Sequence, residues 1–215
     1  MKKLKTVPIV ILVIIVISIL VYFLPTDDLA SRIPFLNRFY TNTTLEIITI
    51  KGKAKVSIDG KDYGETPVTI NELTPGDYTV KLERISDSKS FYKTQTLTIK
   101  LTKNTTSRIE IEIGPAGILH GALLYYSPQS SLDENQGSLS ILSEVKDSKV
   151  YLDEEYIKKT PIISKKLTAK EYELEISSDG YESIKIPILI EEGNLLNIKT
   201  YLFPIPINFD TVDNG

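Results

Sequence analysis

The sequence predicts an all-β protein, with two tandem small antiparallel β-sandwich domains preceded by one transmembrane α-helix. Three observations lead to this prediction: segments that alternate apolar and polar residues, a repeat of apolar positions at a shift of 94 residues, and an uncharged run near the N-terminus. Alternation with period two is typical of strands that have one buried and one solvated face. After residue 45 we find no convincing helical pattern.

The N-terminal segment predicts where the protein is located. Residues 1–6 form a short basic start, and residues 7–24 carry no charge. As a helix, the uncharged run measures about 27 Å, close to the hydrocarbon thickness of a bilayer. Lysines precede it and two aspartates follow, which orients the N-terminus to the cytoplasm. We therefore expect a single-pass protein of the cytoplasmic (plasma) membrane, in contact with the lipid bilayer through residues 7–24. Its later domains are then extracytoplasmic.

A cleaved secretory signal is the alternative for this segment. Such a signal has the same charged start, but usually a shorter apolar centre with small residues before the cleavage site. The run here is long and rich in Ile and Val. The sequence thus favours a retained anchor.

The composition excludes several kinds of function. The chain has no cysteine, so it holds no disulfide, thiolate metal site or thiol nucleophile. His120 is the only histidine, which rules out a histidine triad or a multi-histidine metal site. Beyond the three N-terminal lysines, 22 basic residues face 28 acidic ones, whereas a nucleic-acid surface needs a basic face. We expect no enzyme, no cofactor, no metal and no nucleic-acid partner.

Two copies of one packed unit account for most of the remaining chain. Val56, Ile58 and Asp59 correspond to Val150, Leu152 and Asp153, and apolar positions persist while intervening residues change. This pattern indicates a repeated core. The segment between the copies begins apolar enough to add a strand to one domain and ends as a polar linker. The predicted divisions are a juxtamembrane linker 25–43, domain 44–115, inter-repeat strand and linker 116–136, domain 137–206, and tail 207–215.

The motif residues of the first copy each have a turn to make. An Asp-Gly pair is preferred in a two-residue hairpin loop with positive φ at both positions. A proline fixes its own φ and keeps the preceding residue extended, and Pro-Gly suits a turn with positive φ at its second central residue. These rules assign structural roles to Asp59, Gly60, Gly64, Thr66, Pro67, Pro75, Gly76 and Tyr78.

The second copy keeps only part of this motif. At the hairpin, Asp153 is followed by Glu154 instead of glycine, and a side chain in a left-handed conformation costs on the order of 1 kcal/mol. We therefore predict a different turn there, of type I. Turns that diverge while strands persist favour a scaffold over a backbone-lined binding site. The motif residues kept in this copy are Asp153, Thr160, Pro161 and Tyr172.

At these residues the sequence resembles a known family. The stretch "VSIDGKDYGETPVTINELTPGDYTVKL" is similar to the PEGA domain, a small β-rich module of bacterial and archaeal envelope proteins. The second copy matches less fully, but its "SDGYES" places Gly180 and Tyr181 where the family commonly has Gly-Tyr. The resemblance implies a sandwich similar to surface-layer and carboxypeptidase-regulatory-like modules. It carries over no catalytic residue.

Four tyrosines are candidates for a partner or ligand surface. Tyr151 and Tyr156 align with polar residues of the first copy, so we expect them to face outward. With Tyr125 and Tyr126 of the connecting segment, they are positioned to form a platform for a sugar ring or a protein partner. Two alternatives stay open: packing between the domains buries the same rings, or the rings have no binding role.

Together these observations predict a non-catalytic structural or protein-interaction module of the cell envelope. The expected partner is another envelope protein or a cell-wall polymer. A carbohydrate-binding or cell-wall-binding module is the first alternative, and an accessory or sensory ectodomain is the second.

Overall fold

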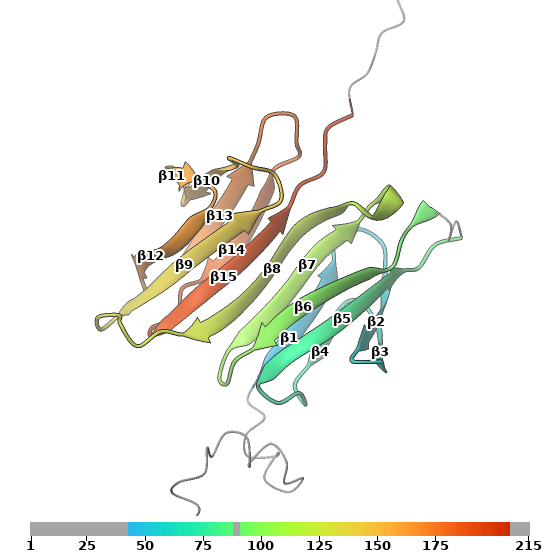
Figure 1. Ribbon diagram of the computed structural model, residues 1–215, viewed down its shortest axis with the longest axis horizontal. Helices are drawn as coiled ribbons and strands as arrows, with labels where there is room; N and C mark the ends of the chain where they lie inside the picture. The colour runs from blue at the N-terminus through green and yellow to red at the C-terminus, as the bar shows by residue number, and fades with distance from the viewer. Residues whose placement is uncertain (1–42, 88–90, 207–215) are drawn as a thin grey trace, which may run out of the picture. The chain divides into compact units, whose positions relative to one another are not determined.

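The computed structural model describes residues 43–87 and 91–206, which form strands and one single-turn 3-10 helix, η2 (Pro115–Gly117) (Figure 1). The strands are β1 (Thr44–Thr49), β2 (Ala54–Ile58), β3 (Lys61–Glu65), β4 (Val68–Ile70), β5 (Gly76–Arg84), β6 (Gln95–Leu101), β7 (Thr106–Ile113), β8 (Leu119–Pro128), β9 (Gln136–Ser143), β10 (Lys149–Leu152), β11 (Glu155–Lys159), β12 (Ile162–Thr168), β13 (Glu171–Ser177), β14 (Ile184–Leu189) and β15 (Asn194–Tyr201).

The all-β prediction is confirmed for this part of the chain. Within it, no helix has the length and apolar character needed to cross a bilayer. The predicted span, residues 7–24, lies outside the described residues, as do the basic start, nearly all of the juxtamembrane linker and the tail. The membrane anchor therefore stays a prediction.

The strands form three sheets. The central sheet has the order β12-β9-β15-β8-β7-β1-β4 and runs through both repeats. The first outer sheet, β3-β2-β5-β6, belongs to the first repeat, and the second outer sheet, β11-β10-β13-β14, belongs to the second. Each repeat is thus a sandwich made of one outer sheet and half of the central sheet.

Strand β8 joins the two repeats into one sheet. It comes from the segment expected to add a strand to one domain, but it pairs antiparallel with β7 of the first repeat and with β15 of the second (Figure 1). The prediction that this segment joins only one domain was therefore too narrow. A strand has hydrogen-bonding groups along both edges, and β8 lies between two half-sheets, so each edge pairs with a different repeat. The repeats share a hydrogen-bonded strand and are not independent sandwiches.

The sequence predicts antiparallel sandwiches, but the central sheet also contains parallel pairs of strands. The first and last strands of each repeat pair in parallel, β1 with β7 and β9 with β15. Alternation of apolar residues reports which face is buried, but it is the same for both strand directions. A parallel pair needs a long crossover connection, and here the outer sheet of each repeat supplies it.

The two hydrophobic cores lie on opposite sides of β8. Leu123 and Tyr125 pack with the first core, whereas Leu124 and Tyr126 pack with the second. Successive side chains of a strand point to opposite faces, so the two outer sheets cover opposite faces of the central sheet. Because β8 is buried on both sides, its sequence is a nearly continuous apolar run, without the alternation of a half-exposed strand.

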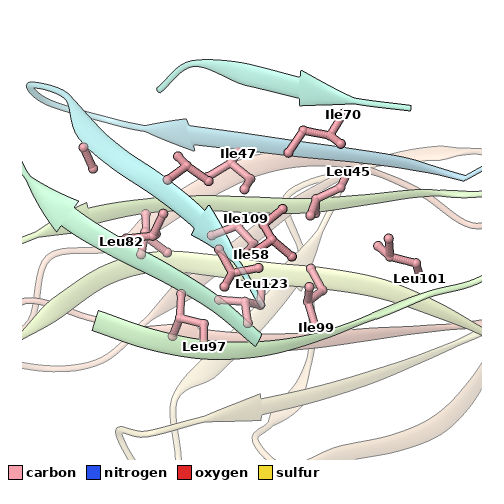
Figure 2. Close-up of a cluster of buried hydrophobic side chains, with 14 of the residues drawn as sticks. Leu45, Ile47, Ile58, Ile70, Leu82, Leu97, Ile99, Leu101, Ile109 and Leu123 are labelled. Atoms are coloured by element: carbon pink, nitrogen blue, oxygen red, sulfur yellow. The ribbon is translucent and has the colours of Figure 1, made fainter. Parts of the chain in front are cut away.

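The first core brings side chains of the central and first outer sheets together. Figure 2 shows Leu45 and Ile47 of β1 in one cluster of buried side chains with Leu82 of β5 and Ile99 of β6, and all four are almost fully buried. Burial of such a side chain stabilises a fold by about 1.5–3 kcal/mol. The equivalent residues of the second core, at the same shift of 94, are Leu139, Ile141 and Ile176 for Leu45, Ile47 and Leu82.

Gly121 of β8 allows the two repeats to meet, and we predict that Gly121→Ala is severely destabilising. A β-carbon there would lie 2.2 Å from the carbonyl oxygen of Glu110 on β7. That oxygen is backbone and cannot move away alone. The free energy of unfolding, measured by urea denaturation, should fall by about 3 kcal/mol or more.

Gly193→Ala is the matched control for this prediction. Gly193 also has a positive φ, of 71°, but no atom lies within 4 Å of the place that a β-carbon would take. Only backbone strain of about 1 kcal/mol applies. Equal losses for the two variants would contradict the close approach of β7 and β8.

Candidate functional site

The aspartate of each hairpin connects the hairpin tip to the neighbouring strand. The backbone N–H of Asp59 donates to the carbonyl of Thr79 (3.0 Å), and the N–H of Thr79 donates to the Asp59 carboxylate (2.9 Å). Asp153 and Glu173 make the same two hydrogen bonds in the second repeat, both at 2.9 Å. The hydrogen bond from the Glu173 N–H lowers the pKa of Asp153, and the hydrogen bond from the Lys170 ammonium lowers it further. The motif aspartates thus hold β10 and β13, or β2 and β5, in place.

The predicted change of turn at Asp153-Glu154 is wrong. Asp59 and Gly60 have φ values of 47° and 85°, and Asp153 and Glu154 have 49° and 67°. Both hairpins therefore use the left-handed conformation at both loop positions. The reciprocal bonds of Asp153 to β13, together with Lys170 at 3.0 Å, hold the loop in this shape although Glu154 lacks the freedom of glycine.

The threonine of each Thr-Pro step is buried and makes two hydrogen bonds to the backbone of one other residue, an arrangement that we call the buried clasp. Thr66 donates its N–H to the Ala54 carbonyl (2.9 Å), and its hydroxyl oxygen accepts from the Ala54 N–H (2.9 Å). Thr160 and Ser148 repeat both bonds at 2.8 and 3.2 Å. The peptide bonds to the following prolines, Pro67 and Pro161, are cis. The sequence predicts only an extended backbone for Thr66, whereas in the structure its hydroxyl also holds the start of β2.

The other turn residues also serve the fold. Gly64 has a φ of 88° and donates its N–H to the Asp62 carboxylate (2.8 Å) beside a bulge between β2 and β3. Pro75 is exposed just before Gly76, which begins β5. In the second repeat the N–H of Ile205 donates to the carbonyl of Gly180 (2.8 Å), next to a bridge between Tyr181 and Pro204.

Tyr78 and Tyr172 are half-buried against the two cores, with their hydroxyls turned back to the chain. Tyr78 donates to the carbonyl of Thr74 (2.9 Å), and Tyr172 donates to that of Thr168 (3.3 Å). A tyrosine whose hydroxyl hydrogen-bonds to the backbone a few residues upstream forms a tyrosine corner, a stabilising feature known from β-sandwiches. Both residues therefore fix the entry into β5 and β13.

The four candidate surface tyrosines divide into two groups. Tyr151 and Tyr156 lie together on the second outer sheet, with ring centroids 5.5 Å apart in an edge-to-face arrangement at 63°. Tyr156 is 52% exposed. Tyr125 is partly buried against the first core, and buried Tyr126 donates its hydroxyl to the Leu189 carbonyl (2.7 Å). The candidate platform is therefore reduced to Tyr151 and Tyr156.

A groove of about 280 Å³ runs beside β14 and the central sheet. Arg108 donates to the carbonyl of Pro187 (2.6 Å), close to where Tyr126 bonds Leu189. These two side chains occupy carbonyls on the otherwise open edge of β14, which blunts the edge against pairing with another chain. Burial raises the pKa of Glu191, another residue of this groove. The sequence does not indicate this role of Arg108, because a charged residue at that place fits an ordinary solvated strand position.

A buried ion pair holds one end of the first repeat together. Arg84 donates to the carboxylate of Glu112, which is only 6% exposed, and to the carbonyl of Ile113 (2.6 Å). The N–H of Lys51 donates to the same carboxylate (2.6 Å), and the Arg84 guanidinium lies over the ring of Tyr92 (4.5 Å). Removing one partner of such a pair costs about 3–5 kcal/mol. This cluster is fully engaged in the fold.

His120, the only histidine of the chain, holds the segment after β15 in place. Its Nδ1 accepts a hydrogen bond from the N–H of Phe203 (3.1 Å), so the imidazole is neutral with its proton on Nε2. Burial lowers the pKa of His120, partly opposed by Glu182 and Glu112 and reinforced by Lys51. The phenyl ring of Phe203 also lies beside the imidazole, with centroids 5.1 Å apart.

No group of three or more histidine, aspartate or glutamate side chains suited to a metal ion occurs in residues 43–87 and 91–206. The motif residues that the sequence singles out use their polar groups for hydrogen bonds within the chain, at hairpin loops, at the Thr-Pro steps and at the start of β5 and β13. Fold and motif together define a tandem β-sandwich module whose repeated residues are structural.

The PEGA domain family matches residues 42–116 and 136–205, and the chain belongs to this family as two tandem copies. PEGA domains are modules of the extracellular type. No curated protein matches the chain in sequence.

One solved structure that resembles the chain is the TIE protein of Bacillus anthracis. It is 14% identical in sequence, with a TM-score of 0.26. The match covers 76% of this chain and 34% of that protein, so this chain spans about a third of its length.

Exchanging the hairpin residue between the repeats should change stability in opposite directions. Glu154→Gly relieves a left-handed side chain and should raise the free energy of unfolding by about 1 kcal/mol, whereas Gly60→Glu should lower it by a similar amount. Urea denaturation measures both. The double variant serves as control, because effects in separate repeats should nearly cancel. A loss of stability in Glu154→Gly would show that Glu154 makes a favourable contact.

The stability of the protein should fall as the pH is lowered below about 6.5. The unfolded chain then protonates His120 near its ordinary pKa, while the folded protein, whose His120 pKa is lowered, resists protonation. The folded state therefore loses stability as the pH falls from about 6.5 toward the lower folded-state pKa of His120, and this effect is absent well above pH 6.5. Urea denaturation at pH 7.5 and 5.5 measures the difference.

His120→Asn is the control for the pH prediction, because its side-chain oxygen can accept the Phe203 N–H but does not titrate. This variant should lose less stability than the native protein between the two pH values. No other imidazole contributes, since His120 is the only histidine. Identical pH dependence in both proteins would contradict the assignment.

Proposed function

We propose that the chain is a membrane-anchored, extracytoplasmic protein whose PEGA domains act as a non-catalytic structural or protein-interaction module of the cell envelope. The observation that carries this proposal is the central sheet, which continues through both repeats by way of β8. Such a connection fixes one repeat relative to the other. A rigid pair of domains suits a spacer or a docking scaffold.

The motif residues support the same proposal. Asp59, Thr66 and Tyr78, with their counterparts in the second repeat, use their polar groups within the chain. In an enzyme, several polar side chains are expected to converge on a cleft where a substrate binds. Here the residues shared by the two repeats maintain turns, so their polar groups contribute to the shape of the module.

The N-terminal sequence supports the anchor. Residues 7–24 are uncharged and long enough for one span, with lysines on the predicted cytoplasmic side. In this arrangement the described domains follow the membrane span on its outer side. The partner that we expect there is another envelope protein.

A carbohydrate-binding role is the second candidate function. The observation in its favour is the pair of Tyr151 and Tyr156, which combines a half-exposed ring with an edge-to-face neighbour. Aromatic rings provide flat apolar area with a polar hydroxyl at the edge, which suits the faces of sugar rings.

Cysteine labelling tests the proposed topology, because the native chain has no cysteine. Ser131→Cys places a thiol at an exposed position between β8 and β9. It should react with a membrane-impermeant maleimide in intact cells, whereas Lys3→Cys should react only after lysis. Ser138→Cys, at a fully buried position, should react only after denaturation and is the folding control.

Two results would contradict the proposal. The first is labelling of Lys3→Cys in intact cells, or of Ser131→Cys only after lysis, which would reverse the topology. The second comes from a cross-linking experiment. A maleimide-diazirine reagent attached to Ser131→Cys in native envelopes should yield a discrete cross-link to another envelope protein. Absence of any such product from this and other exposed cysteines would argue against a protein-interaction module.

A further inference from the structure

Four side chains meet at one corner of the second outer sheet. Tyr151 lies directly opposite Tyr156, and Lys149 lies directly opposite Lys159, on the neighbouring strands β10 and β11. Val150 and Leu152 point into the second core. Since alternate residues of a strand share a face, Lys149 and Tyr151 face outward with their cross-strand partners. We name Lys149, Tyr151, Tyr156 and Lys159 the corner patch.

A bulge in β11 produces this arrangement. The register shifts between Val150 and Tyr151, so that Ile157 is the extra residue of the partner strand. Ile157 is partly buried against the second core. A bulge re-aims the side chains beside it, and here it allows Tyr156 to stay on the outer face with Tyr151.

The lysines give the corner patch an excess of positive charge. The ammonium of Lys149 lies 3.1 Å from the carboxylate of Asp179, which is itself highly exposed. That hydrogen bond raises the pKa of Lys149. Lys159 is exposed, and among residues 43–87 and 91–206 it has no ion-pair partner. Like charges placed opposite each other destabilise a strand pair, so a bound anion would relieve this repulsion.

The first repeat provides an internal comparison. At the equivalent positions it has Lys55, Ser57, Asp62 and Glu65, with Lys55 directly opposite Glu65. None of these four residues is aromatic, and together they carry one positive and two negative charges. The two repeats share the same hairpin, bulge and buried clasp. The fold therefore does not require the tyrosines or the second lysine.

The border of the corner patch toward β13 is mixed in charge. Glu175 lies opposite Tyr151, and Lys185 of β14 lies opposite Glu175. Lys185 also pairs with Glu173 at 2.7 Å. Lys185 thus offsets part of the acidic charge of β13, whereas the positive charge of Lys159 lies at the outer edge of the sheet.

From this arrangement we propose that the corner patch binds an anionic saccharide. Sugar rings pack on Tyr151 and Tyr156, and the carboxylate or phosphate groups of the polymer are held by Lys149 and Lys159. The proposal deepens the second candidate function, and it is independent of the topology on which the first depends. A carboxylated polysaccharide and a sugar or polyol phosphate present the same acidic chemistry to the lysines.

Retention of the full-length protein in detergent on immobilised polymers tests the proposal. The surfaces are polygalacturonate as the carboxylate, glycerol-phosphate teichoic acid as the phosphate, and dextran as the neutral control. The native protein should be retained on at least one acidic surface and not on dextran, and retention should weaken with salt. The surface that retains it distinguishes the two sources of acidic groups.

An exchange between the repeats provides matched variants. The triple variant Tyr151→Ser, Tyr156→Asp and Lys159→Glu gives the second repeat the residues that the first repeat already tolerates. Its affinity should fall about tenfold or more, since tenfold corresponds to about 1.4 kcal/mol. The reverse exchange, Ser57→Tyr, Asp62→Tyr and Glu65→Lys, should add a second site. Thermal unfolding checks that both variants are folded.

Three results would overturn the proposal: retention on neither acidic surface, equal retention on dextran, or unchanged affinity in a folded triple variant. None of them affects the labelling experiment on topology. Conversely, a reversed topology would leave a positive binding result intact, so the two failures are distinguishable.

Discussion

Strand β8 imposes the constraint on which the rest of the structure depends, because it is buried on both faces and hydrogen-bonded on both edges. Its odd-numbered side chains Leu123 and Tyr125 complete the first core, and its even-numbered Leu124 and Tyr126 complete the second. The strands on either side are β7 and β15, the last strands of the two repeats. Each repeat therefore depends on a strand that belongs to neither family match. A substitution in β8 therefore alters the packing of both cores. Local unfolding of one repeat exposes one face of β8, a strand that also completes the core of the other repeat.

Within each repeat, polar groups fix what the hydrophobic cores leave undetermined. Apolar burial is not directional, so it brings the sheets together without deciding how the hairpin lies. The reciprocal bonds of Asp153 with Glu173, and of Thr160 with Ser148, supply that direction. They are the same in both repeats, which explains how Glu154 keeps a conformation that its own side chain disfavours. The network joins the Asp153 carboxylate and the Thr160 hydroxyl to main-chain groups and does not involve the Glu154 side chain, so residue 154 can change without altering it.

The sequence was sufficient for the class of fold, the repeat and the core positions, because alternation and self-similarity follow directly from burial. It was insufficient for the pairing of strands. Parallel and antiparallel partners bury the same residues, and an apolar segment such as β8 shows no preference for one edge over the other. The candidate tyrosines show the same limit. Alignment with Ser57 and Asp62 indicated that Tyr151 and Tyr156 face outward, but nothing in the local sequence distinguished Tyr126, whose burial is set by the second outer sheet.

Two copies of one fold in a single chain separate what the fold requires from what the surface adds. Residues common to both, such as Asp59 and Asp153, make equivalent contacts and belong to the fold. Residues that differ on equivalent outer faces are free of that requirement, so their chemistry reflects solvent, partners or ligands. The first repeat has an opposite-charge pair, Lys55 and Glu65, at the place where the second has two lysines beside two tyrosine rings. An arrangement that the fold does not need, and that electrostatics disfavours in isolation, is most simply explained by something that binds there.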